Sequence, residues 1–384
     1  MVKIRVCHVI TRLIHGGAQE NTLLTVNGLD PKRYEVTLVG GPPLGRRGGI
    51  LHRVHARVHV MIIPQMRRAV NPVADFIAFW KLYRLFRRAN FAIVHTHSTQ
   101  AGIYGRLAAR LAGVPHIIHT VHGLAFHAQL NPFARAIAWT GEKMASSFTE
   151  KIICVSDAMV VQSLKGHIAP REKFITIRSG FDTAKFVKAR PSRTFRASYR
   201  IPNDEILVAQ IGGLVPLKGC EDFVRAAALV HQQFPNAHFT FIGDGELQDA
   251  LRKQVECAGL QQRFHFVGMV AAEDLPAVLA SIDIVAHCSL REGLPRVVAQ
   301  ALAARKACVA VDMDGTQEII RHGRTGLLVP ARQPQKIADS ICRLIGDPRL
   351  RIQLGNAGQK AVRIAFDQKL MIKKISAVYE ELLQ

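Results

Sequence analysis

The chain has 384 residues, of which 48% are hydrophobic and 21% charged, a composition typical of a globular protein with room for two cores. This composition excludes an intrinsically disordered chain, and no apolar run approaches the roughly 20 residues that cross a bilayer as a helix. Lys and Arg outnumber Asp and Glu by 51 to 29, and residues 1–180 alone hold 24 basic against 8 acidic residues. Such an excess favours an anionic partner: a phosphate-bearing substrate, an acidic membrane surface or nucleic acid. Solubility alone is the alternative explanation.

The first residues and the cysteines indicate the compartment. The stretch MVKIRVCHVITRL has charged residues inside its apolar run, so we expect a first strand there and not a signal peptide. Seven cysteines are scattered without a Cys-x-x-Cys pair, which suits buried thiols in a reducing cytoplasm. We therefore expect a cytoplasmic protein.

In the first half of the chain, short runs rich in β-branched residues alternate with helical segments. This alternation predicts a mostly parallel sheet covered on both faces. The expected strands are Lys3–Ile10, Val36–Val39, Val60–Ile63, Ile93–His95, Ile117–Thr120, Ile152–Val155 and Phe174–Ile177, and the expected helices include Ala18–Gly28, Val73–Arg88, Gln100–Ala112 and Phe133–Ser146.

The alternation stops around residues 182–204, where the chain is polar and basic with two prolines, and then starts again. The fold class that this pattern predicts is α/β, with two Rossmann-like αβα domains facing a central cleft, where ligands bind at the carboxyl ends of the strands. The expected second-half strands are Ile206–Ile211, Phe239–Ile242, Phe264–Val267, Ile284–Ala286, Ala307–Val311 and Gly326–Val329. The expected divisions are an N-terminal domain (1–182), a linker (183–204), a C-terminal domain (205–366) and a closing helix (367–384) that crosses back to the first domain.

Two stretches of the first half carry candidate chemistry. Gly16 and Gly17 open a helix after the first strand, so exposed N–H groups at a positive helix end could face a phosphate. A tight turn is the alternative, and the stretch is not a GxGxxG motif. His122 follows a strand directly and is expected to donate a hydrogen bond to a substrate. The other nearby histidines, His95 and His97 among them, lack the ligand spacing of a zinc site, so we expect no metal.

In the second half, three loops that follow strands carry the candidate residues. Lys218, in IGGLVPLKG, stands where an ammonium could meet a phosphate. Gly243 and Gly245 form a glycine turn after another strand. Glu292 stands in the loop of HCSLREGLPRVV, and Pro295 suits the first turn of the helix that follows.

Taken in order, these stretches resemble glycosyltransferase family 4, whose members are retaining enzymes with the GT-B fold. GGAQEN resembles the glycine loop on the acceptor side of that family, TVHG its histidine loop and PLKG its phosphate-binding lysine. REGLP followed by GRTGLLVP resembles its donor-site helix and the next strand. HTHSTQAGIYGRLAARLAGVP together with HTVHGLAFH is most similar to bacterial members that build surface polysaccharides on lipid carriers.

The resemblance implies a reaction and a set of residues. A sugar would pass from a nucleotide diphosphate to an acceptor without a protein nucleophile, so the protein would position both substrates and stabilise the leaving diphosphate. Glu292 would hold the donor sugar, Lys218 the diphosphate and His122 the edge of the transferred sugar. The remaining donor-binding positions would be Gly293, Leu294, Pro295, Val297, Gln300, Gly243 and Gly245, and Gly16 and Gly17 would form the acceptor loop.

Three positions depart from the family pattern. Gln300 stands where a second glutamate usually binds the nucleotide ribose, and the change from carboxylate to amide weakens that hydrogen bond by about 1 kcal/mol. Gly213 stands where the family usually has an arginine, and Arg305 where it has a glycine. These departures keep a second class open, a non-catalytic nucleotide-sugar-binding or scaffold subunit with a degenerate donor site.

The expected partners follow from the same reading. They are a UDP- or GDP-sugar and a lipid-linked or glycan acceptor, with no cofactor and no metal. The helix around Asp75–Arg88 could lie on an anionic membrane surface with Phe76, Phe79 and Trp80 inward, but a helix packed on the core of the first sheet, with a basic end, is the favoured interpretation. Nucleic acid is not expected, because the chain has few Trp and Tyr residues and no known recognition module.

Overall fold

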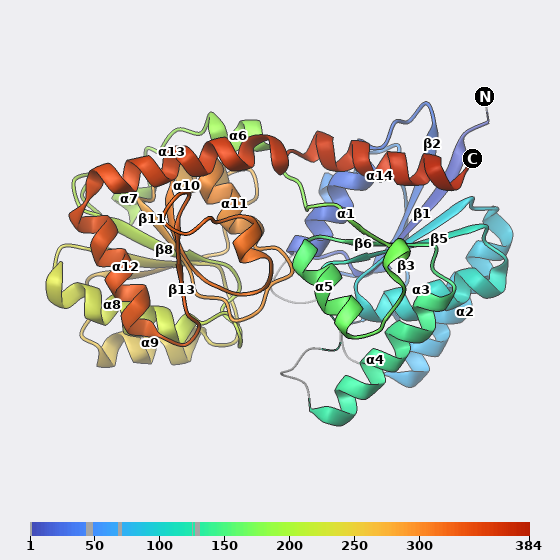
Figure 1. Cartoon of the computed structure of the whole chain (residues 1–384), viewed down its shortest axis with the longest axis horizontal. Helices are drawn as coiled ribbons and strands as arrows, with labels where there is room; N and C mark the ends of the chain where they lie inside the picture. The colour runs from blue at the N-terminus through green and yellow to red at the C-terminus, as the bar shows by residue number, and fades with distance from the viewer. Residues whose placement is uncertain (1, 44–48, 68–70, 125, 127–130) are drawn as a thin grey trace. The chain divides into compact units, whose positions relative to one another are not determined.

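The computed structural model describes residues 2–43, 49–67, 71–124, 126 and 131–384. They form two compact units, Met1–Gly180 together with Gln368–Gln384, and Phe181–Asp367. Each unit is one sheet with helices on both faces (Figure 1). This is the α/β architecture that the alternating pattern of the sequence predicts.

The first unit contains a seven-stranded sheet in which every strand pair is parallel. Its order, β3-β2-β1-β4-β5-β6-β7, places β1 beside both β2 and β4. Residues 6–11 of β1 are buried, as expected for a central strand covered on both faces. The strands are β1 (Ile4–Arg12), β2 (Tyr34–Gly41), β3 (His59–Ile62), β4 (Ile93–His97), β5 (His116–Val121), β6 (Lys151–Cys154) and β7 (Phe174–Thr176).

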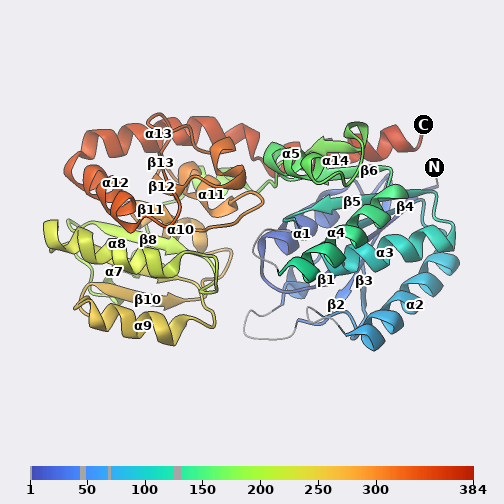
Figure 2. The same cartoon turned by 60° about the horizontal axis from the view of Figure 1, so that its bottom comes forward.

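Helices cover the two faces of this sheet with separate cores. One core includes side chains of α1 and α14, and the other includes side chains of α2 and α3. α3 lies between α2 and α4 (Figures 1 and 2). The helices of this unit are α1 (Gly17–Gly28), α2 (Pro72–Ala89), α3 (Thr99–Ala112), α4 (Pro132–Ser147), α5 (Asp157–Lys165) and α14 (Gln368–Leu382), with short 3₁₀ turns η1 (Leu51–Arg53) and η2 (Arg171–Lys173).

Local sequence explains where α2 and α4 begin. Each follows an asparagine and starts with a proline. The side chain of Asn71 accepts a hydrogen bond from the Ala74 N–H, and that of Asn131 accepts one from the Ala134 N–H. The proline after each asparagine loses no hydrogen bond at this position, because the first N–H groups of a helix have no partner within it.

The last helix, α14, belongs to the core of the first unit. Met371, Ile375, Val378 and Tyr379 are buried there, and α14 packs against α1. The contact with α1 is close, since a Cβ added to Gly28 would lie 2.2 Å from Cδ1 of Ile372. The first unit is therefore completed by residues that follow the whole second unit in the sequence.

The second unit has a six-stranded parallel sheet in the order β10-β9-β8-β11-β12-β13. α8 packs against α12 and α9, and α11 packs against α13. The strands are β8 (Leu207–Ile211), β9 (His238–Ile242), β10 (Phe264–Gly268), β11 (Ile284–His287), β12 (Ala307–Val311) and β13 (Leu327–Val329). The helices are α6 (Thr183–Val187), α7 (Phe195–Ser198), α8 (Cys220–Gln233), α9 (Gln248–Cys257), α10 (Leu275–Ala280), α11 (Arg296–Ala303), α12 (Pro334–Gly346) and α13 (Pro348–Ala365), with the 3₁₀ turn η3 (Asp314–Glu318).

Residues 183–204, expected from the sequence to be a linker, lie within the second unit. Arg196 explains this difference: its guanidinium donates to Asp283 Oδ2 at 2.5 Å and to the carbonyl oxygens of Ser281, Pro202 and Glu205. The polar, proline-containing composition that suggested a linker thus supplies the charged contacts that hold the segment. The chain enters the second unit at Phe181 and leaves it after Asp367.

Among the described residues, no helix is both long and apolar enough to cross a bilayer.

The burial of α14 gives the first prediction. Replacing Ile375 by Ala should destabilise the first unit by about 2–4 kcal/mol, because it removes buried methylene groups and leaves a cavity. Hydrogen–deuterium exchange of the full chain should show faster exchange in α1 and β1, with the second unit unchanged.

The matched control is Ile352→Ala on α13, where the side chain is 61% exposed and little burial is lost. Exchange in α1 that is equally slow in the Ile375 variant and the parent protein would contradict a structural role for α14.

Candidate functional site

Both sheets reverse their strand order beside the first strand of the unit, β1 in one and β8 in the other. The loops that leave two neighbouring strands there run in opposite directions, which leaves room for a ligand at the carboxyl ends of the strands. In the first unit these strands are β1 and β4, and in the second they are β8 and β11. Candidate residues from the sequence stand at both places.

In the second unit the reversal brings together Lys218 and Glu292, which are 74 positions apart in the sequence. Lys218 follows β8 and Glu292 follows β11, and the Lys218 ammonium donates a hydrogen bond to Glu292 Oε1. A backbone bond joins the two loops, since the Leu290 N–H donates to the Leu217 carbonyl oxygen at 2.8 Å. The two side chains are partly exposed, at 31% and 19%, so a ligand can reach the pair.

The charges of this pair are set by its surroundings. Burial alone would raise the pKa of the Glu292 carboxyl, but the Lys218 ammonium, the His287 ring and hydrogen bonds from Lys218 and Ser289 together lower it below its ordinary value. Glu292 therefore stays ionised at neutral pH. Burial lowers the pKa of His287 to about 4, so this imidazole is neutral.

His287 is a residue that the sequence did not single out. It ends β11, and its Nε2 lies 3.5 Å from Glu292 Oε1. Nearby, Gln210 on β8 donates from Nε2 to the Lys218 carbonyl oxygen at 2.9 Å. His287 Nε2 and Gln210 Oε1 are buried and have no hydrogen-bond partner among the described residues. A polar side chain at the end of a buried strand is the signal that could have identified both.

The donor-site helix expected from the sequence is α11, and Pro295 occupies its N-cap position. The N-cap residue Pro295 forms no side-chain capping hydrogen bond at this end. Gly293 and Leu294, which precede the cap, are buried, whereas Val297 and Gln300 in the helix are partly exposed. The N-terminus of α11 thus follows Glu292 closely, as the motif predicts.

Gly243 and Gly245 lie against the loop that follows β8. A Cβ added to Gly243 would lie 1.9 Å from the Gly212 carbonyl oxygen, and one added to Gly245 would lie 2.1 Å from the Leu214 carbonyl oxygen. Gly243 also has φ of 143°, a conformation that favours glycine. Both glycines are therefore needed because two backbone segments approach closely, and they fix the loop that contains Lys218.

Arg305 does not supply the charge that Gly213 lacks. Its guanidinium Nε donates to Gln359 Oε1 on α13 at 3.0 Å. The residue has φ of 60°, which agrees with the glycine that the family usually has there. The side chain thus packs on a neighbouring helix.

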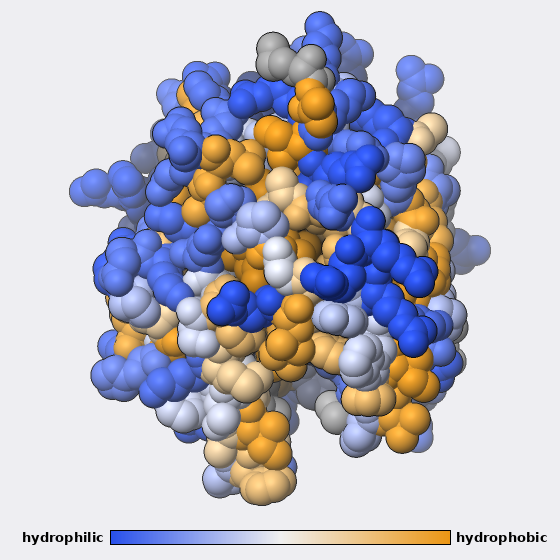
Figure 3. Space-filling model, turned by 90° about the vertical axis from the view of Figure 1, so that its right-hand side faces the viewer, coloured by the Kyte–Doolittle hydropathy of each residue, from blue (hydrophilic) through white to orange (hydrophobic). Residues whose placement is uncertain are grey.

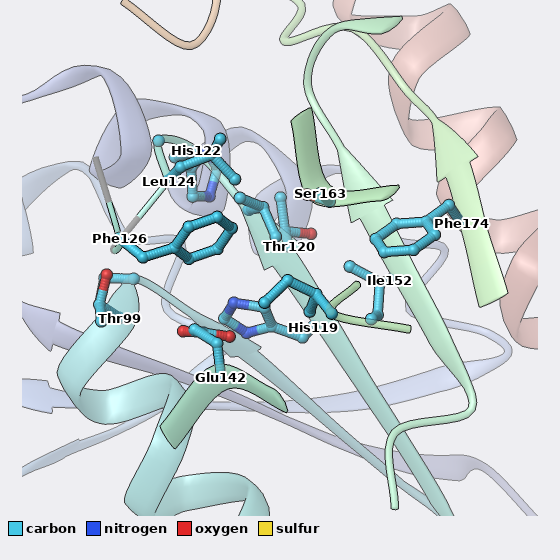
Figure 4. Close-up of a pocket in the computed structure, with 14 residues that line it drawn as sticks. Thr99, His119, Thr120, His122, Leu124, Phe126, Glu142, Ile152, Ser163 and Phe174 are labelled. Atoms are coloured by element: carbon cyan, nitrogen blue, oxygen red, sulfur yellow. The ribbon is translucent and has the colours of Figure 1, made fainter. Parts of the chain in front are cut away.

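The first unit has a pocket of about 230 Å³ where β5 ends (Figure 4). His122 lines it, directly after β5, as the sequence predicts. The other labelled side chains around it are the hydroxyls Thr99, Thr120 and Ser163, the apolar Leu124, Phe126, Ile152 and Phe174, and the ionisable His119 and Glu142. A pocket with apolar walls and a few polar groups is a typical ligand site.

The charge of Glu142 in this pocket is balanced internally. Arg106 is fully buried and donates to Glu142 Oε2 at 2.7 Å. His119 pairs with Thr96 instead, at 2.8 Å between Nδ1 and the hydroxyl oxygen. Burial, followed by the Arg106 charge, holds the pKa of His119 well below its ordinary value. His119 is therefore neutral, and the charge of the Glu142 carboxylate is balanced by Arg106.

Behind the pocket, the structure joins six side chains that we call the histidine chain: Thr120, His95, Tyr379, His8, His97 and His122. The strand register places His8 beside His95 and His97 beside Thr120. Burial lowers the pKa of His8 to about 3, and burial together with neighbouring imidazoles lowers the pKa of His95 and His97 well below the ordinary value. These three rings are therefore neutral.

His8, His95 and His97 also form a set that could hold a metal ion, with one ligand atom from each within 4.8 Å of the others. The sequence expectation of no metal overlooked His8, which lies 87 and 89 positions before its neighbours. Two nitrogens bound to one zinc ion at about 2.0–2.1 Å cannot be more than about 4.2 Å apart. Ligand atoms separated by a distance near 4.8 Å would therefore have to move closer together before they could bind the ion. Moreover, His8 Nδ1 and His97 Nε2 already pair with each other at 3.0 Å.

The glycine pair lies at the start of α1. Gly16 is the N-cap residue, and Gly17 is the first residue of the helix. A Cβ added to Gly17 would meet no atom within 4 Å, so the space beside it is open. These residues and His122 belong to the first unit, whereas Lys218 and Glu292 belong to the second.

Two Rossmann-like units of this order, with the pair Lys218–Glu292 at one reversal and His122 near the other, define the class of GT-B glycosyltransferases. The model of glycosyltransferase family 4 matches residues 15–185, and that of the glycosyl transferases group 1 matches residues 191–361. The chain belongs to glycosyltransferase family 4, and it is a glycosyltransferase with a two-domain GT-B fold.

Relatives agree with this assignment. The chain is 26% identical over 385 residues to an Escherichia coli UDP-Gal:alpha-D-GlcNAc-diphosphoundecaprenol alpha-1,3-galactosyltransferase, covering 99% of this chain and 98% of that protein. It is 22% identical to the Staphylococcus aureus capsular polysaccharide biosynthesis glycosyltransferase CapM, covering 84% and 85%. Its fold is similar to that of Anabaena HepE in complex with UDP and glucose, with a TM-score of 0.84, 21% identity and coverage of 98% and 100%.

The close approach at Gly245 gives the second prediction. Gly245→Ala should destabilise the second unit by about 1–3 kcal/mol, because the new methyl group collides with a backbone carbonyl and the loop of Lys218 must move. Thermal unfolding measures the change in stability, and hydrogen–deuterium exchange shows whether it is confined to the second unit.

The control is Gly346→Ala at the end of α12, where the nearest atom to the added Cβ is Phe234 Cζ at an ordinary 3.8 Å. This substitution should change stability by less than about 0.5 kcal/mol. Equal stabilities of the two variants would show that the turn is not tightly packed.

Proposed function

We propose that this protein is a retaining glycosyltransferase that transfers a sugar from a nucleotide diphosphate to a lipid-carrier-linked or glycan acceptor in cell-surface polysaccharide synthesis. The observation that carries the proposal is the Lys218–Glu292 pair at the strand-order reversal of the second unit. The names of the relatives support a polysaccharide product and, in the galactosyltransferase, a lipid-diphosphate acceptor.

The leaving group is the diphosphate, so the donor site must stabilise developing negative charge. The Lys218 ammonium and the N-terminal N–H groups of α11 supply positive potential of the kind that a diphosphate binds. In the free protein Glu292 balances the lysine charge and holds the ammonium near the end of β8. On donor binding, the ammonium contacts a phosphate oxygen as well.

Glu292 has the second role. An ionised carboxylate accepts hydrogen bonds, and the hydroxyls of a hexose donate them. Because Glu292 is ionised and partly exposed, it can hold the sugar while Lys218 holds the phosphate attached to it. The two side chains thus grip the two sides of the bond that breaks.

Retention needs both substrates on one face of the sugar. The bond between the anomeric carbon and the diphosphate oxygen breaks, and the acceptor oxygen bonds to the same carbon on the same face. The acceptor proton passes to an oxygen of the departing diphosphate, so charge and atoms balance without a protein nucleophile. Positioning and charge stabilisation are then the work of the protein. No resident cofactor or metal enters this proposal.

Gly213, Gln300 and Arg305 bear on donor affinity. Because Arg305 is bonded to Gln359, the position of Gly213 lacks the charge that the family usually has. Loss of one charge-assisted contact weakens binding by about 10- to 100-fold. We therefore propose weak donor binding and not the scaffold subunit, since the chain is a family 4 glycosyltransferase.

A membrane surface is the second part of the proposal, and α2 and α4 support it. On α2, Val73 and Phe76 are 70% and 61% exposed, and on α4 Phe133 is 77% exposed. Both helices begin on the same side of the first unit (Figures 1 and 2), and apolar residues gather in the lower part of the view in Figure 3. Basic side chains accompany them and are exposed: Lys81, Arg84, Arg87 and Arg88 on α2, and Arg135 and Lys143 on α4.

This arrangement is compatible with both interpretations of α2, a helix packed on the core and a helix at a membrane surface. Ala78, Leu82 and Phe86 are buried on the sheet side, and Phe79 packs partly against the same core, while Phe76 and Trp80 remain exposed. The helix therefore packs on the core with one face and offers an apolar, basic face to an anionic lipid surface. We place the protein on the cytoplasmic face of a membrane, where a lipid-linked acceptor would be found.

The donor site gives the third prediction. Lys218→Met should weaken UDP binding by about 10- to 100-fold, because a charge-assisted phosphate contact is lost. Glu292→Ala should retain most UDP affinity and lose transfer by at least about 100-fold, because the sugar is no longer held. Calorimetric titration and turnover with UDP-, GDP- and ADP-sugars measure both, and the anomeric configuration of the product tests retention.

Lys185→Met is the control, since Lys185 is exposed in the same unit and pairs with Asp182. It should leave binding and turnover unchanged. Full turnover of the Glu292 variant would refute the role assigned to that carboxylate, whatever the donor.

The exposed helices give the fourth prediction. Sedimentation with liposomes that contain anionic phospholipid should decline as salt rises, because the basic side chains are screened. The double variant Phe76→Ser and Phe133→Ser should bind about tenfold more weakly at low salt, because two apolar side chains no longer enter the lipid.

Ile352→Ser and Ile364→Ser together form the control, since both residues are exposed on α13 of the second unit. Binding that is insensitive to salt and to both double variants would exclude this docking surface.

A further inference from the structure

The histidine chain is continuous from one pocket residue to another. Thr120 Oγ1 and His95 Nε2 are 2.7 Å apart, and His95 Nδ1 and the Tyr379 hydroxyl oxygen are 2.6 Å apart. The same hydroxyl oxygen lies 3.2 Å from His8 Nε2. His8 Nδ1 and His97 Nε2 are 3.0 Å apart, and His97 Nδ1 and His122 Nε2 are 3.2 Å apart. Thr120 and His122 both line the pocket.

Counting protons limits the chain to two arrangements. A neutral imidazole carries one N–H and one accepting nitrogen, and each hydroxyl can donate one hydrogen bond and accept others. His8, His95 and His97 each use both ring nitrogens within the chain. The Tyr379 hydroxyl must itself donate within the chain, because it is fully buried and has no other acceptor among the described residues. All five hydrogen bonds can then form only if every member donates in the same direction along the chain. Reversing one member would place two protons, or none, between a pair of atoms.

The buried end at Thr120 selects one direction. If His95 donated to Thr120, the threonine hydroxyl proton would need another acceptor, and none is recorded for it among the described residues. Thr120 is 2% exposed, so a lost hydrogen bond there would not be replaced by bulk water. In the other direction Thr120 donates to His95, His95 to Tyr379, Tyr379 to His8, His8 to His97 and His97 to His122.

We propose that the histidine chain is a positioning device that fixes the tautomer of His122, so that its Nε2 accepts within the protein and its Nδ1 carries the proton. The inference rests on the proposed function for the meaning of His122 in transfer, but the tautomer itself does not depend on it. His8, His95, His97 and Tyr379 are then positioning residues, since they act through His122.

The consequence for the pocket is a fixed pattern of hydrogen bonding. An imidazole that is free to exchange tautomers offers a donor or an acceptor at either nitrogen, whereas a fixed one has a single pattern. A sugar hydroxyl or ring oxygen near a fixed N–H always meets a donor. Because the three buried rings are neutral, this pattern is also held without introducing a charge into the first unit.

Tyr379 gives α14 a part in this device. Its hydroxyl is the only member of the chain from that helix, and it joins His95 to His8, two residues on neighbouring strands that are not bonded to each other by any recorded hydrogen bond. Without the hydroxyl the chain divides into two halves, and Thr120 no longer determines the direction at His122.

The fifth prediction concerns the tautomer directly. In the full-length protein labelled with ¹⁵N-histidine, long-range proton–nitrogen spectra should show His122 with a protonated Nδ1 and an unprotonated Nε2. The signals are assigned by their absence in His122→Asn. Tyr379→Phe should yield a mixture of both tautomers at His122 and lower kcat by about tenfold, with the KM for the nucleotide sugar little changed.

Tyr34→Phe is the matched control. Tyr34 is buried beside Tyr379, with ring centroids 5.9 Å apart, and its hydroxyl has no hydrogen-bond partner among the described residues. This variant removes a hydroxyl from the same core outside the chain, so it should leave the His122 spectrum and kcat unchanged. Should Tyr379→Phe not fold, Thr120→Val tests the other end, and Thr120→Ser should restore the parent spectrum.

Three results would overturn the proposal. One is a His122 Nε2 that carries a proton in the parent protein, and another is a spectrum that Tyr379→Phe and Thr120→Val both leave unchanged. The third is a stoichiometric metal, found by elemental analysis and lost in His8→Ala, because His8 and His97 would then bind the metal and not each other. Absence of glycosyl transfer in the parent protein would refute the proposed function but not the tautomer.

Discussion

The reversal of strand order beside β1 and β8 is the constraint on which both candidate sites depend. Parallel strands cannot offer polar side chains along their length without burying them, but at the carboxyl ends of two neighbouring strands the loops diverge and polar groups reach open space. In the second unit this geometry sets Lys218 beside Glu292, and the bond from Leu290 to Leu217 keeps the two loops together. In the first unit the direct pairing of β1 with β4 at this reversal sets His8 beside His95 within the sheet.

The two units meet the cost of burying polar groups in different ways. In the second, opposite charges balance each other: Glu292 remains ionised because the ammonium of Lys218 is beside it. In the first, the central rings are neutral, and hydrogen bonds replace charge. A charged pair suits a donor whose diphosphate is itself charged, because one partner can be exchanged for a ligand oxygen. A neutral network suits recognition of hydroxyls, which do not compensate a buried charge.

The sequence predicted those parts of the fold that local pattern controls. Each of the expected strands overlaps an observed strand, because parallel strands, most of them buried, are runs of β-branched residues that stand out from their surroundings. The start of α2 follows from Asn71 and its following proline. The positions of Lys218 and Glu292 could also be predicted from the sequence. Both residues stand in glycine-containing loops just after a strand, and such loops meet at a reversal of strand order.

What the sequence did not predict depends on contacts between distant positions. His8 became part of a site only through the register of β1 with β4, and Tyr379 lies 284 positions from the histidine that its hydroxyl contacts most closely. The segment around Arg196 has the composition of a linker, and only the position of Asp283 shows why it packs. The same dependence explains α14: its buried residues complete the core beside α1, yet they are made after the whole second unit. The first unit therefore cannot reach its final packing until the second unit has been synthesised, and the hydroxyl that joins His95 to His8 arrives only after that unit.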